Sequence, residues 1–529
     1  MDQAQPESLI TTKVSPRPIN RRAMLKLAAA GTLLSLASPS APARQLETVS
    51  AALPTLRINP QPRFELSRHL YMQFMEPLGS TDGSVAAAWD HLQDRWGESF
   101  MKASRELAPP LMRWGGCFSS YYRWKEAVGP RDRRQQMFNL LWGGMESNQV
   151  GTVEFVDFCR QVGAEALMAV NFESDGRKGW MKDPRGSLRS AGPAEAAEWV
   201  AYCNQPDNRD RLADGLKDPC TIPLWQIGNE TSYDRNGFDL DTTARKTLEF
   251  ARTMRRADPM IKLIGWGDSG WAPRMAEIAG EELQYLAFHH MYAPGGKNSP
   301  LHGNDYRKDP TATWEALMEA HKPHEARLVE MRQQASGTKL PLALTECHWV
   351  LPGPNRNFVL SSWAAGVAMA RLLNVHTRHG DVLKIATAAD FCGTRWQNNA
   401  VLIGDHGQSY LQPVAQVMRL YRHHVGDHAV AAEEVPAGLD VTVSRTGNHI
   451  FVHVINTHRN RAVPARLIVA GMRLISGDVF EIAAEPEFEV WMENRETISP
   501  RQKSLPVSGE WTFPAASVSA IELKLAPSA

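Results

Sequence analysis

The chain has 529 residues, more than one hydrophobic core usually organises, so we expect two or three domains. Its composition is ordinary for a globular protein, with 43% apolar residues, 22% charged residues and a formal net charge of +0. A nucleic-acid-binding protein needs a basic face to neutralise phosphates, and an anionic membrane attracts basic segments. The zero net charge argues against both partners.

The first 43 residues have the pattern of an export signal. Arg21 and Arg22 precede a short apolar run from Leu27 to Ala37, and the small residues Ala41 and Ala43 follow it. Paired arginines before such a run are typical of a bacterial twin-arginine signal peptide. The run is shorter than the ~20 residues that span a bilayer. We therefore expect cleavage after Ala43, a periplasmic or secreted protein, and no membrane contact afterwards.

Short apolar runs alternate with helical patterns between about residues 69 and 425. The eight candidate strands are Leu70–Glu76, Leu111–Trp114, Ala166–Phe172, Leu224–Asn229, Lys262–Gly267, Leu286–Tyr292, Leu342–His348 and Lys384–Phe391. The clearest helical patterns are Ala194–Cys203, Thr242–Arg256, Thr313–Gln334 and Phe358–Thr377. Eight strand–helix units predict an α/β fold, a (β/α)₈ barrel spanning residues 69–425.

An open, doubly wound sheet is the rival fold. One G-x-G-x-x-G match occurs, from Gly265 to Gly270, but it follows the fifth candidate strand instead of the first. The acid expected about 20 residues later is replaced by His289 and His290. The match therefore indicates chance or a tight loop at the barrel rim.

After about residue 425 the pattern changes to alternating apolar and polar residues. Short strands separated by turns predict a C-terminal antiparallel β-sandwich over residues 426–529. The segment 44–68 precedes the barrel, and its stretch Leu56–Pro60 is expected to add a strand to that sandwich.

Acidic and hydrogen-bonding residues gather where the predicted barrel strands end, which is where barrel enzymes hold their active sites. Asn229 and Glu230 follow the fourth strand, and Glu346 lies in the seventh. Glycoside cleavage needs one carboxylic acid to protonate the leaving oxygen and one carboxylate to meet the anomeric carbon. A surface salt bridge is the alternative for any single rim glutamate, but an Asn-Glu pair after a buried strand fits a site better.

Several segments together resemble glycoside hydrolase family 51, the α-L-arabinofuranosidase family within the clan of retaining barrel glycosidases. The segments are Arg113–Phe118, Tyr122–Lys125, Gly129–Arg134, Gly151–Phe155, Ala169–Asn171, Glu198–Asn204 and Trp225–Glu230. The resemblance covers most of the chain after the signal, and the family also carries a C-terminal sandwich.

The resemblance implies a role for each matching residue. Glu230 would be the general acid/base and Glu346 the nucleophile of a double displacement. The substrate-binding residues would be Glu76, Arg113, Cys117, Asn229, His290, Tyr292 and Asp390. Two positions depart from the family pattern: Thr345-Glu346-Cys347 stands where Asp-Glu-Trp is common, and Asp390 stands where we expect a glutamine. The second departure leaves the exact sugar open, because an ionised carboxylate accepts hydrogen bonds but cannot donate them.

Other functions stay open. The same barrel could cleave glucan or xylan chains internally, or the protein could bind carbohydrate without cleaving it. Cys117, Cys347 and Cys392 could hold zinc with His290 or His348, or supply a thiolate. Their spacing matches no ligand motif, so we expect no metal and no cofactor. The expected partner is an oligo- or polysaccharide that contains arabinose. An oligomer is possible.

Overall fold

The structure is a computed structural model that describes residues 53–292, 298–351, 358–395 and 397–528. The expected signal segment, residues 1–43, lies outside the described residues. Within these ranges, no helix has both the length and the apolar character needed to cross a bilayer.

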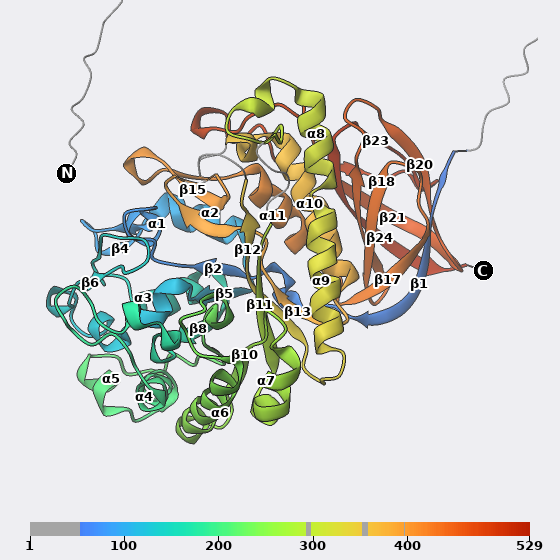
Figure 1. Cartoon of the computed structure of the whole chain (residues 1–529). Coiled ribbons are helices and arrows are strands. Elements are labelled where there is room, and N and C mark those ends of the chain that lie inside the picture. Colours follow the sequence, from blue (N-terminus) through green and yellow to red (C-terminus); the bar gives the residue numbers. More distant parts are fainter. Residues whose placement is uncertain (1–52, 293–297, 352–357, 396, 529) are drawn as a thin grey trace, which may run out of the picture. The chain divides into compact units, whose positions relative to one another are not determined.

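Eight parallel strands form one sheet in which spatial order follows chain order (Figure 1). They are β2 (Gln73–Met75), β5 (Leu111–Trp114), β8 (Glu165–Val170), β9 (Leu224–Ile227), β10 (Lys262–Trp266), β11 (Tyr285–Tyr292), β12 (Leu342–Trp349) and β13 (Leu383–Ala386). The Met72 amide donates a hydrogen bond to the Ala386 carbonyl at 3.0 Å and so joins the two ends of the sheet.

Side chains from all eight strand segments meet in one buried cluster inside this sheet. The cluster consists of Met72, Leu111, Leu167, Leu224, Ile264, Trp266, Ala287, Ala343 and Ile385. A barrel interior filled by apolar side chains in this way is a packed core and not a pore. The predicted (β/α)₈ barrel is confirmed.

Helices cover the outside of the barrel (Figure 1). They include α2 (Glu98–Leu107), α3 (Thr152–Val162), α4 (Pro193–Asn204), α6 (Leu240–Ala257), α7 (Ala272–Ala279), α8 (Pro310–Glu319), α9 (His321–Ala335), α10 (Trp363–Arg378) and α11 (Pro413–His423), with the short α1 (Ser84–Ala88) and α5 (Arg209–Ala213). In α6, Asp239 caps the first turn by accepting from the Thr242 amide at 2.7 Å. Its buried residues recur at helical spacing, as at Thr247, Phe250 and Met254.

Several predicted elements have different bounds in the structure, and the clearest cases are the eighth strand and the helical pattern Thr313–Gln334. The eighth strand ends at Ala386, and Asp390 begins β14 (Asp390–Gly393), which pairs with β15 (Asn399–Ile403) in a separate small sheet with β16 (Ser409–Leu411). The continuous apolar run gave no signal for this break. The helical pattern Thr313–Gln334 is two helices, because Pro323 lacks an amide hydrogen and fits only the first turn of α9.

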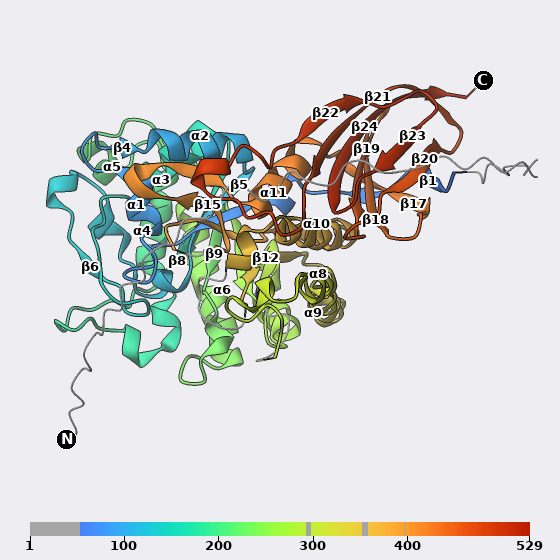
Figure 2. The same ribbon diagram turned by 90° about the horizontal axis from the view of Figure 1, so that it is seen from above.

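The C-terminal strands form a nine-stranded sheet (Figure 2). Its order is β22 (Arg501–Ser504), β21 (Met472–Ala483), β24 (Ser517–Pro527), β19 (His449–Asn456), β18 (Leu439–Thr446), β17 (His428–Glu434), β1 (Thr55–Glu65), β20 (Val463–Val469) and β23 (Glu510–Phe513). β1 is antiparallel to β17 but parallel to β20. Leu56 and Leu467 from one end of the sheet share a buried core with Val479 and Ile521 from the other, so the sheet folds over itself as a sandwich.

Candidate active site

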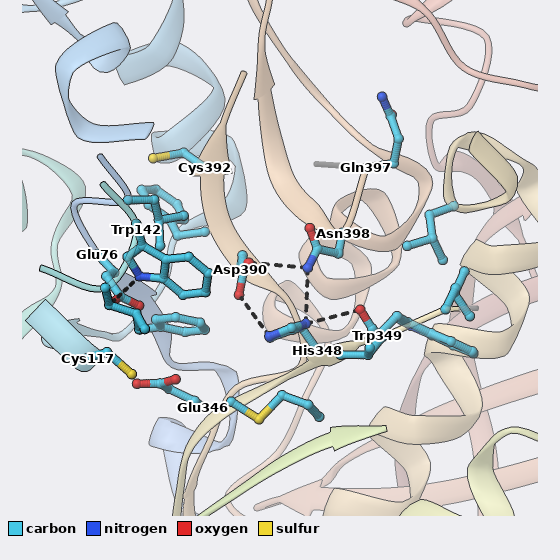
Figure 3. Close-up of a pocket in the computed structure, with 18 of the residues that line it drawn as sticks. Glu76, Cys117, Trp142, Glu346, His348, Trp349, Asp390, Cys392, Gln397 and Asn398 are labelled. Carbon is cyan, nitrogen blue, oxygen red and sulfur yellow. Dashed lines mark hydrogen bonds and ion pairs between the residues drawn. The ribbon is translucent and has the colours of Figure 1, made fainter. Parts of the chain in front are cut away.

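A cavity of about 340 Å³ lies where the barrel strands end. Its polar lining includes Glu76, Cys117, Glu230, Glu346 and Asp390, which come from five different segments of the chain. Figure 3 shows four of them, Glu76, Cys117, Glu346 and Asp390. Tryptophan, leucine and methionine side chains make up much of the remaining wall: Trp142, Trp349, Leu78, Leu141, Leu351, Leu360 and Met291. A concave site with a few converging polar groups in an apolar wall is typical of small-ligand binding.

Glu230 and Glu346 converge on this cavity from opposite parts of the barrel. Carboxylate oxygens of the two residues and a ring nitrogen of His289 all lie within 4.8 Å of one another. The His289 Nδ1 is 3.0 Å from Glu230 Oε1 and 3.6 Å from Glu346 Oε2. The two glutamates are therefore close enough to act on one bond.

Arg113 fixes the side chains around Glu346. It is fully buried, and its guanidinium donates to Glu346 Oε1 at 2.8 Å, to Asn229 Oδ1 at 2.6 Å and to Gln226 Oε1 at 2.9 Å. This planar fork presents several donors in a rigid geometry that a lysine cannot reproduce. Arg113 thus orients the Glu346 carboxylate next to the cavity.

The turn that carries Glu230 has an unusual backbone. Gly228 has φ +80° and Glu230 itself has φ +54°, a left-handed conformation that a side-chain-bearing residue rarely adopts. Buried Asp175 holds the turn by accepting from the Asn229 amide at 3.1 Å and from the Thr231 hydroxyl at 2.5 Å. Arg177 donates to the Glu230 carbonyl at 2.6 Å. These contacts aim the Glu230 carboxylate into the cavity.

His289 controls the protonation of Glu230. Burial on its own would raise the pKa of the Glu230 carboxyl, but the hydrogen bond and charge of the His289 ring outweigh it, with help from Cys117 and Arg177, and lower the pKa. The other ring nitrogen, Nε2, lies 3.0 Å from the Thr345 hydroxyl, which holds the ring in place. Trp266 packs edge-on against the same ring at 4.8 Å.

Glu76 is the third acid of the cavity, and its environment favours the neutral form. Burial, followed by the charge of Glu346, raises the pKa of this carboxyl well above its usual value. Its Oε1 accepts from the Trp142 indole at 3.3 Å and the Phe118 amide at 3.4 Å (Figure 3). Gly116 packs directly against it: a Cβ there would lie 2.1 Å from the Glu76 carboxyl carbon, so only glycine fits.

Cys117 contacts Glu230 and Asn229. Its thiol donates to Glu230 Oε2 at 3.1 Å, and the Asn229 amide lies 3.8 Å from the sulfur. Burial and the charge of Glu230 raise the pKa of this thiol well above its usual value. A protonated, hydrogen-bonded thiol is a poor nucleophile, which disfavours the thiolate mechanism considered from the sequence.

Asp390 lies in contact with His348 and Asn398 on another wall of the cavity (Figure 3). The Asn398 amide donates to Asp390 Oδ2 at 3.2 Å, and His348 Nε2 lies 3.9 Å from Asp390 Oδ1. Burial, against the opposing charge of His348, raises the pKa of Asp390 to about 6. Asp390 therefore changes charge in the mildly acidic range.

One predicted site residue lies elsewhere. His290 points away from the cavity and forms a hydrogen bond with His324 of α9 at 2.9 Å, because successive side chains of a strand face opposite sides. Its neighbour His289 takes the place in the site. The backbone of Tyr292 ends β11, but its side chain lies outside the described residues.

Sequence reasoning also missed Asp175, Arg177 and Trp142, which lie in loops without a distinctive motif.

The zinc alternative is not supported by the described residues. There, the group of three or more potential ligands within metal-binding distance is Glu230, His289 and Glu346, and it includes no cysteine. Cys347 and Cys392 are buried, and burial raises the pKa of both thiols. The cysteines at the rim therefore act as small packed side chains and not as a metal-binding set.

Comparisons with known proteins agree with the motifs. The family model described as the alpha-L-arabinofuranosidase 1 domain matches residues 103–308. An intracellular exo-alpha-(1->5)-L-arabinofuranosidase of Acetivibrio thermocellus is 29% identical over 252 residues, which cover 43% of this chain and 46% of that protein. A probable alpha-L-arabinofuranosidase C of Aspergillus terreus is 30% identical over 232 residues, covering 41% and 42%. The chain thus aligns with less than half the length of these curated relatives.

Solved structures extend the likeness to almost the whole described chain. The arabinose complex of an alpha-L-arabinofuranosidase from Thermotoga maritima matches with a TM-score of 0.72 at 23% identity, covering 89% of this chain and all of that one. A family 51 enzyme from Bifidobacterium longum matches with a TM-score of 0.73 at 20% identity, covering 89% and 99%. At this level of identity the likeness establishes the shared barrel and sandwich, and the family model adds the sequence evidence.

Proposed function

Because this chain has the fold of the family 51 α-L-arabinofuranosidases and matches their domain model, we propose that it is a retaining glycoside hydrolase that releases arabinofuranosyl groups from oligo- or polysaccharides. The observation that carries the proposal is the approach of the Glu230 and Glu346 carboxylates to within 4.8 Å. Retaining enzymes hold their two carboxyl groups about 5–5.5 Å apart, whereas inverting enzymes need roughly 6.5–9.5 Å to admit a water.

In the first step Glu346 attacks the anomeric carbon and Glu230 protonates the leaving oxygen. The Glu346 carboxylate is held for attack by Arg113, while the bond to the leaving group breaks. The product is a glycosyl ester on Glu346, and the leaving group departs as an alcohol. In the second step Glu230 removes a proton from water, which attacks the same carbon and frees Glu346.

The lowered pKa of Glu230 has a consequence for the first step. At neutral pH the free site holds Glu230 mainly as the carboxylate, so only a fraction of molecules can donate a proton. Substrates with poor leaving groups need that proton, and activated aryl glycosides do not. Neutral Glu76 is suited to donate a hydrogen bond to a sugar hydroxyl, and the Asp390 carboxylate is suited to accept one.

The shape of the site favours action at chain ends. The cavity is a pocket in which apolar side chains surround the acids, whereas internal cleavage of glucan or xylan needs an open groove. A protein that only binds carbohydrate does not need two glutamate carboxylates that converge on one glycosidic bond. Glu230 also has a left-handed backbone conformation, which is strained for a residue with a side chain. We therefore place exo cleavage first and internal cleavage second.

The decisive experiment compares three variants on an activated aryl α-L-arabinofuranoside with and without azide. Glu346→Ala should be inactive, with a loss of at least about 10⁴-fold. Glu230→Ala should still form the glycosyl-enzyme, stall at hydrolysis and recover when azide captures the intermediate. Glu173→Ala is the matched control, because this rim glutamate pairs with Lys246 outside the cavity, and its activity should match the parent.

Three outcomes would contradict the proposal. Activity in Glu346→Ala, or no azide rescue in Glu230→Ala, would remove the assigned roles. NMR of the first-formed sugar should show the retained anomer, and an inverted anomer would exclude the double displacement. A panel of aryl furanosides and pyranosides separates arabinofuranosidase from glucanase or xylanase activity.

Export through the twin-arginine pathway is part of the proposal. It is supported by Arg21 and Arg22 ahead of the apolar run, a segment outside the described residues. Replacing both arginines with lysine should leave the chain in the cytoplasm when cells are fractionated. Normal export of the double variant would contradict this pathway.

A further inference from the structure

Two cysteines far from the cavity lie against each other on neighbouring segments. Cys203 is in the last turn of α4, and Cys220 precedes β9, the strand that leads to Glu230. The Cys220 amide donates to the Cys203 carbonyl at 2.7 Å, and the two thiols are hydrogen-bonded to each other. Both cysteines are free in the structure.

A side chain also holds the two segments together. The Asn204 side chain accepts from the Ile222 amide at 2.8 Å through Oδ1 and donates to the Ile222 carbonyl at 2.9 Å through Nδ2. The backbone hydrogen bond from Cys220 to Cys203 brings the main chains of the two residues into direct contact. A disulfide needs Cα atoms about 4.4–6.8 Å apart, and residues joined by a backbone hydrogen bond can meet that requirement.

We propose that Cys203 and Cys220 are a modification site at which a disulfide bond forms once the folded chain meets an oxidising compartment. The bond would join the end of α4 to the segment that enters β9. It would close a ring over residues 204–219, which include α5. This inference rests on the proposed export to an oxidising compartment but not on the proposed hydrolase activity.

The two thiols differ in their exposure to solvent and in their pKa, so they have different roles in the reaction. Cys220 is partly exposed, whereas Cys203 is completely buried. The hydrogen bond from Cys203, followed by the nearby charges of Arg160 and Arg211, lowers the pKa of the Cys220 thiol. Arg160 is tied to this segment by its hydrogen bond to the Pro219 carbonyl at 2.9 Å. Cys220 is therefore the thiol that reacts first, and Cys203 resolves.

The reaction is an exchange with an external disulfide, such as oxidised glutathione or a disulfide oxidoreductase. The Cys220 thiolate attacks one sulfur of that disulfide, forms a mixed disulfide and releases one thiolate. The Cys203 thiol then loses its proton, attacks the Cys220 sulfur and releases the second thiolate. In balance, two protein thiols become one disulfide and the external disulfide becomes two thiols.

The bond is expected to act on stability and not on the chemistry of the cavity. Neither cysteine lines the cavity, and the ring lies before the start of β9 while Glu230 follows its end. A crosslink stabilises mainly by restricting the unfolded chain. The oxidised protein should therefore unfold at a temperature several degrees higher, with unchanged kcat and KM.

The test equilibrates the purified full chain, first fully reduced, with a glutathione buffer poised at about −180 mV, near that of an oxidising compartment. Alkylation after unfolding should then find four free thiols instead of the six in the sequence, and peptide mapping should find Cys203 linked to Cys220. Cys220→Ser is the main variant, because a partly exposed position tolerates serine. It should keep its other thiols free and lose the redox-dependent shift in Tm.

Cys159→Ser is the matched control, since Cys159 is a buried cysteine of α3 and should leave the crosslink intact. Six free thiols in the oxidising buffer would overturn the proposal. So would glutathione left on Cys220 without resolution, or a crosslink that forms only after the chain is unfolded by denaturant.

Discussion

Two adjacent histidines of β11 belong to different buried polar networks. His289 faces the barrel interior and contacts Glu230, whereas His290 faces the helices and starts a row that continues through His324 of α9 to His376 of α10. The first network holds charges beside a cavity, and the second holds neutral rings within the packed layer of helices. Successive side chains of a strand point to opposite faces, so His289 lies in the network beside the cavity and His290 lies in the network that packs among the helices.

Replacement of Arg113 is expected to have the largest effect on activity among changes to the first network. In Arg113→Lys the charge remains, but the fork that contacts Glu346, Asn229 and Gln226 is lost, so Glu346, the proposed nucleophile, is misplaced. We expect kcat/KM to fall by about 10²-fold or more, because small misplacements of a reacting group are costly. Arg189→Lys is the control: its fork contacts Glu126 away from the cavity, and steady-state rates should hardly change. Equal losses in both variants would mean that the effect is general destabilisation.

His289 tests whether the network sets the protonation of Glu230. Since the pKa of Glu230 is lowered, kcat/KM on a substrate with a poor leaving group should fall as pH rises through that pKa. His289→Gln removes the hydrogen bond and the electrostatic effect of the ring, which lower the pKa of Glu230, so this pKa should rise and the falling limb should move to higher pH. An activated aryl substrate should not show this shift, and His290→Gln should leave both profiles in place. If the falling limb of the kcat/KM profile does not move in His289→Gln, the limb reports a group whose pKa does not depend on His289.

Asp390 offers a smaller test within the cavity. Its pKa is raised to about 6, so it is a carboxylate above this pH and becomes neutral below it. A charged acceptor holds a hydroxyl about 1 kcal/mol more strongly than a neutral one, so KM should rise severalfold as pH falls through 6. Asp390→Asn should show a KM that varies less with pH. If the two proteins have parallel KM profiles, Asp390 does not contact the sugar.

The sequence predicted the barrel and the glutamate pair because both depend on strong local signals. β5 has the predicted bounds, and the positions of Glu230 and Glu346 near the ends of two barrel strands predicted that they converge. The exchange of His289 and His290 shows the limit: a fully buried strand is apolar on both faces, so nothing in its pattern indicates which residue points inward. Asp175 acts through contacts with Ser120, Asn229 and Thr231, and only the folded chain brings these together.

The histidine row of the second network should matter only for stability in acid. Burial, followed by the charges of neighbouring histidines, lowers the pKa of His376 to about 3, while the pKa of His324 is also well below its usual value. An unfolded histidine titrates near 6.5. Above that pH neither state binds the proton; as pH falls toward the folded pKa, only the unfolded state does, so stability is lost. Each such histidine contributes a loss of at most about 1.4 kcal/mol per pH unit.

His376→Gln should make the loss of stability below pH 6.5 less steep, even though the variant is less stable at neutral pH. The quantity to compare is therefore the slope of the unfolding free energy, measured by urea titration between pH 7 and pH 5, and not its absolute value. His449→Gln is the control, because this side chain is exposed at the start of β19 and should leave the slope unchanged. Parallel slopes for the parent and His376→Gln would show that the row is already protonated in the folded state. The kcat of all three proteins should agree at neutral pH, because the row does not touch the cavity.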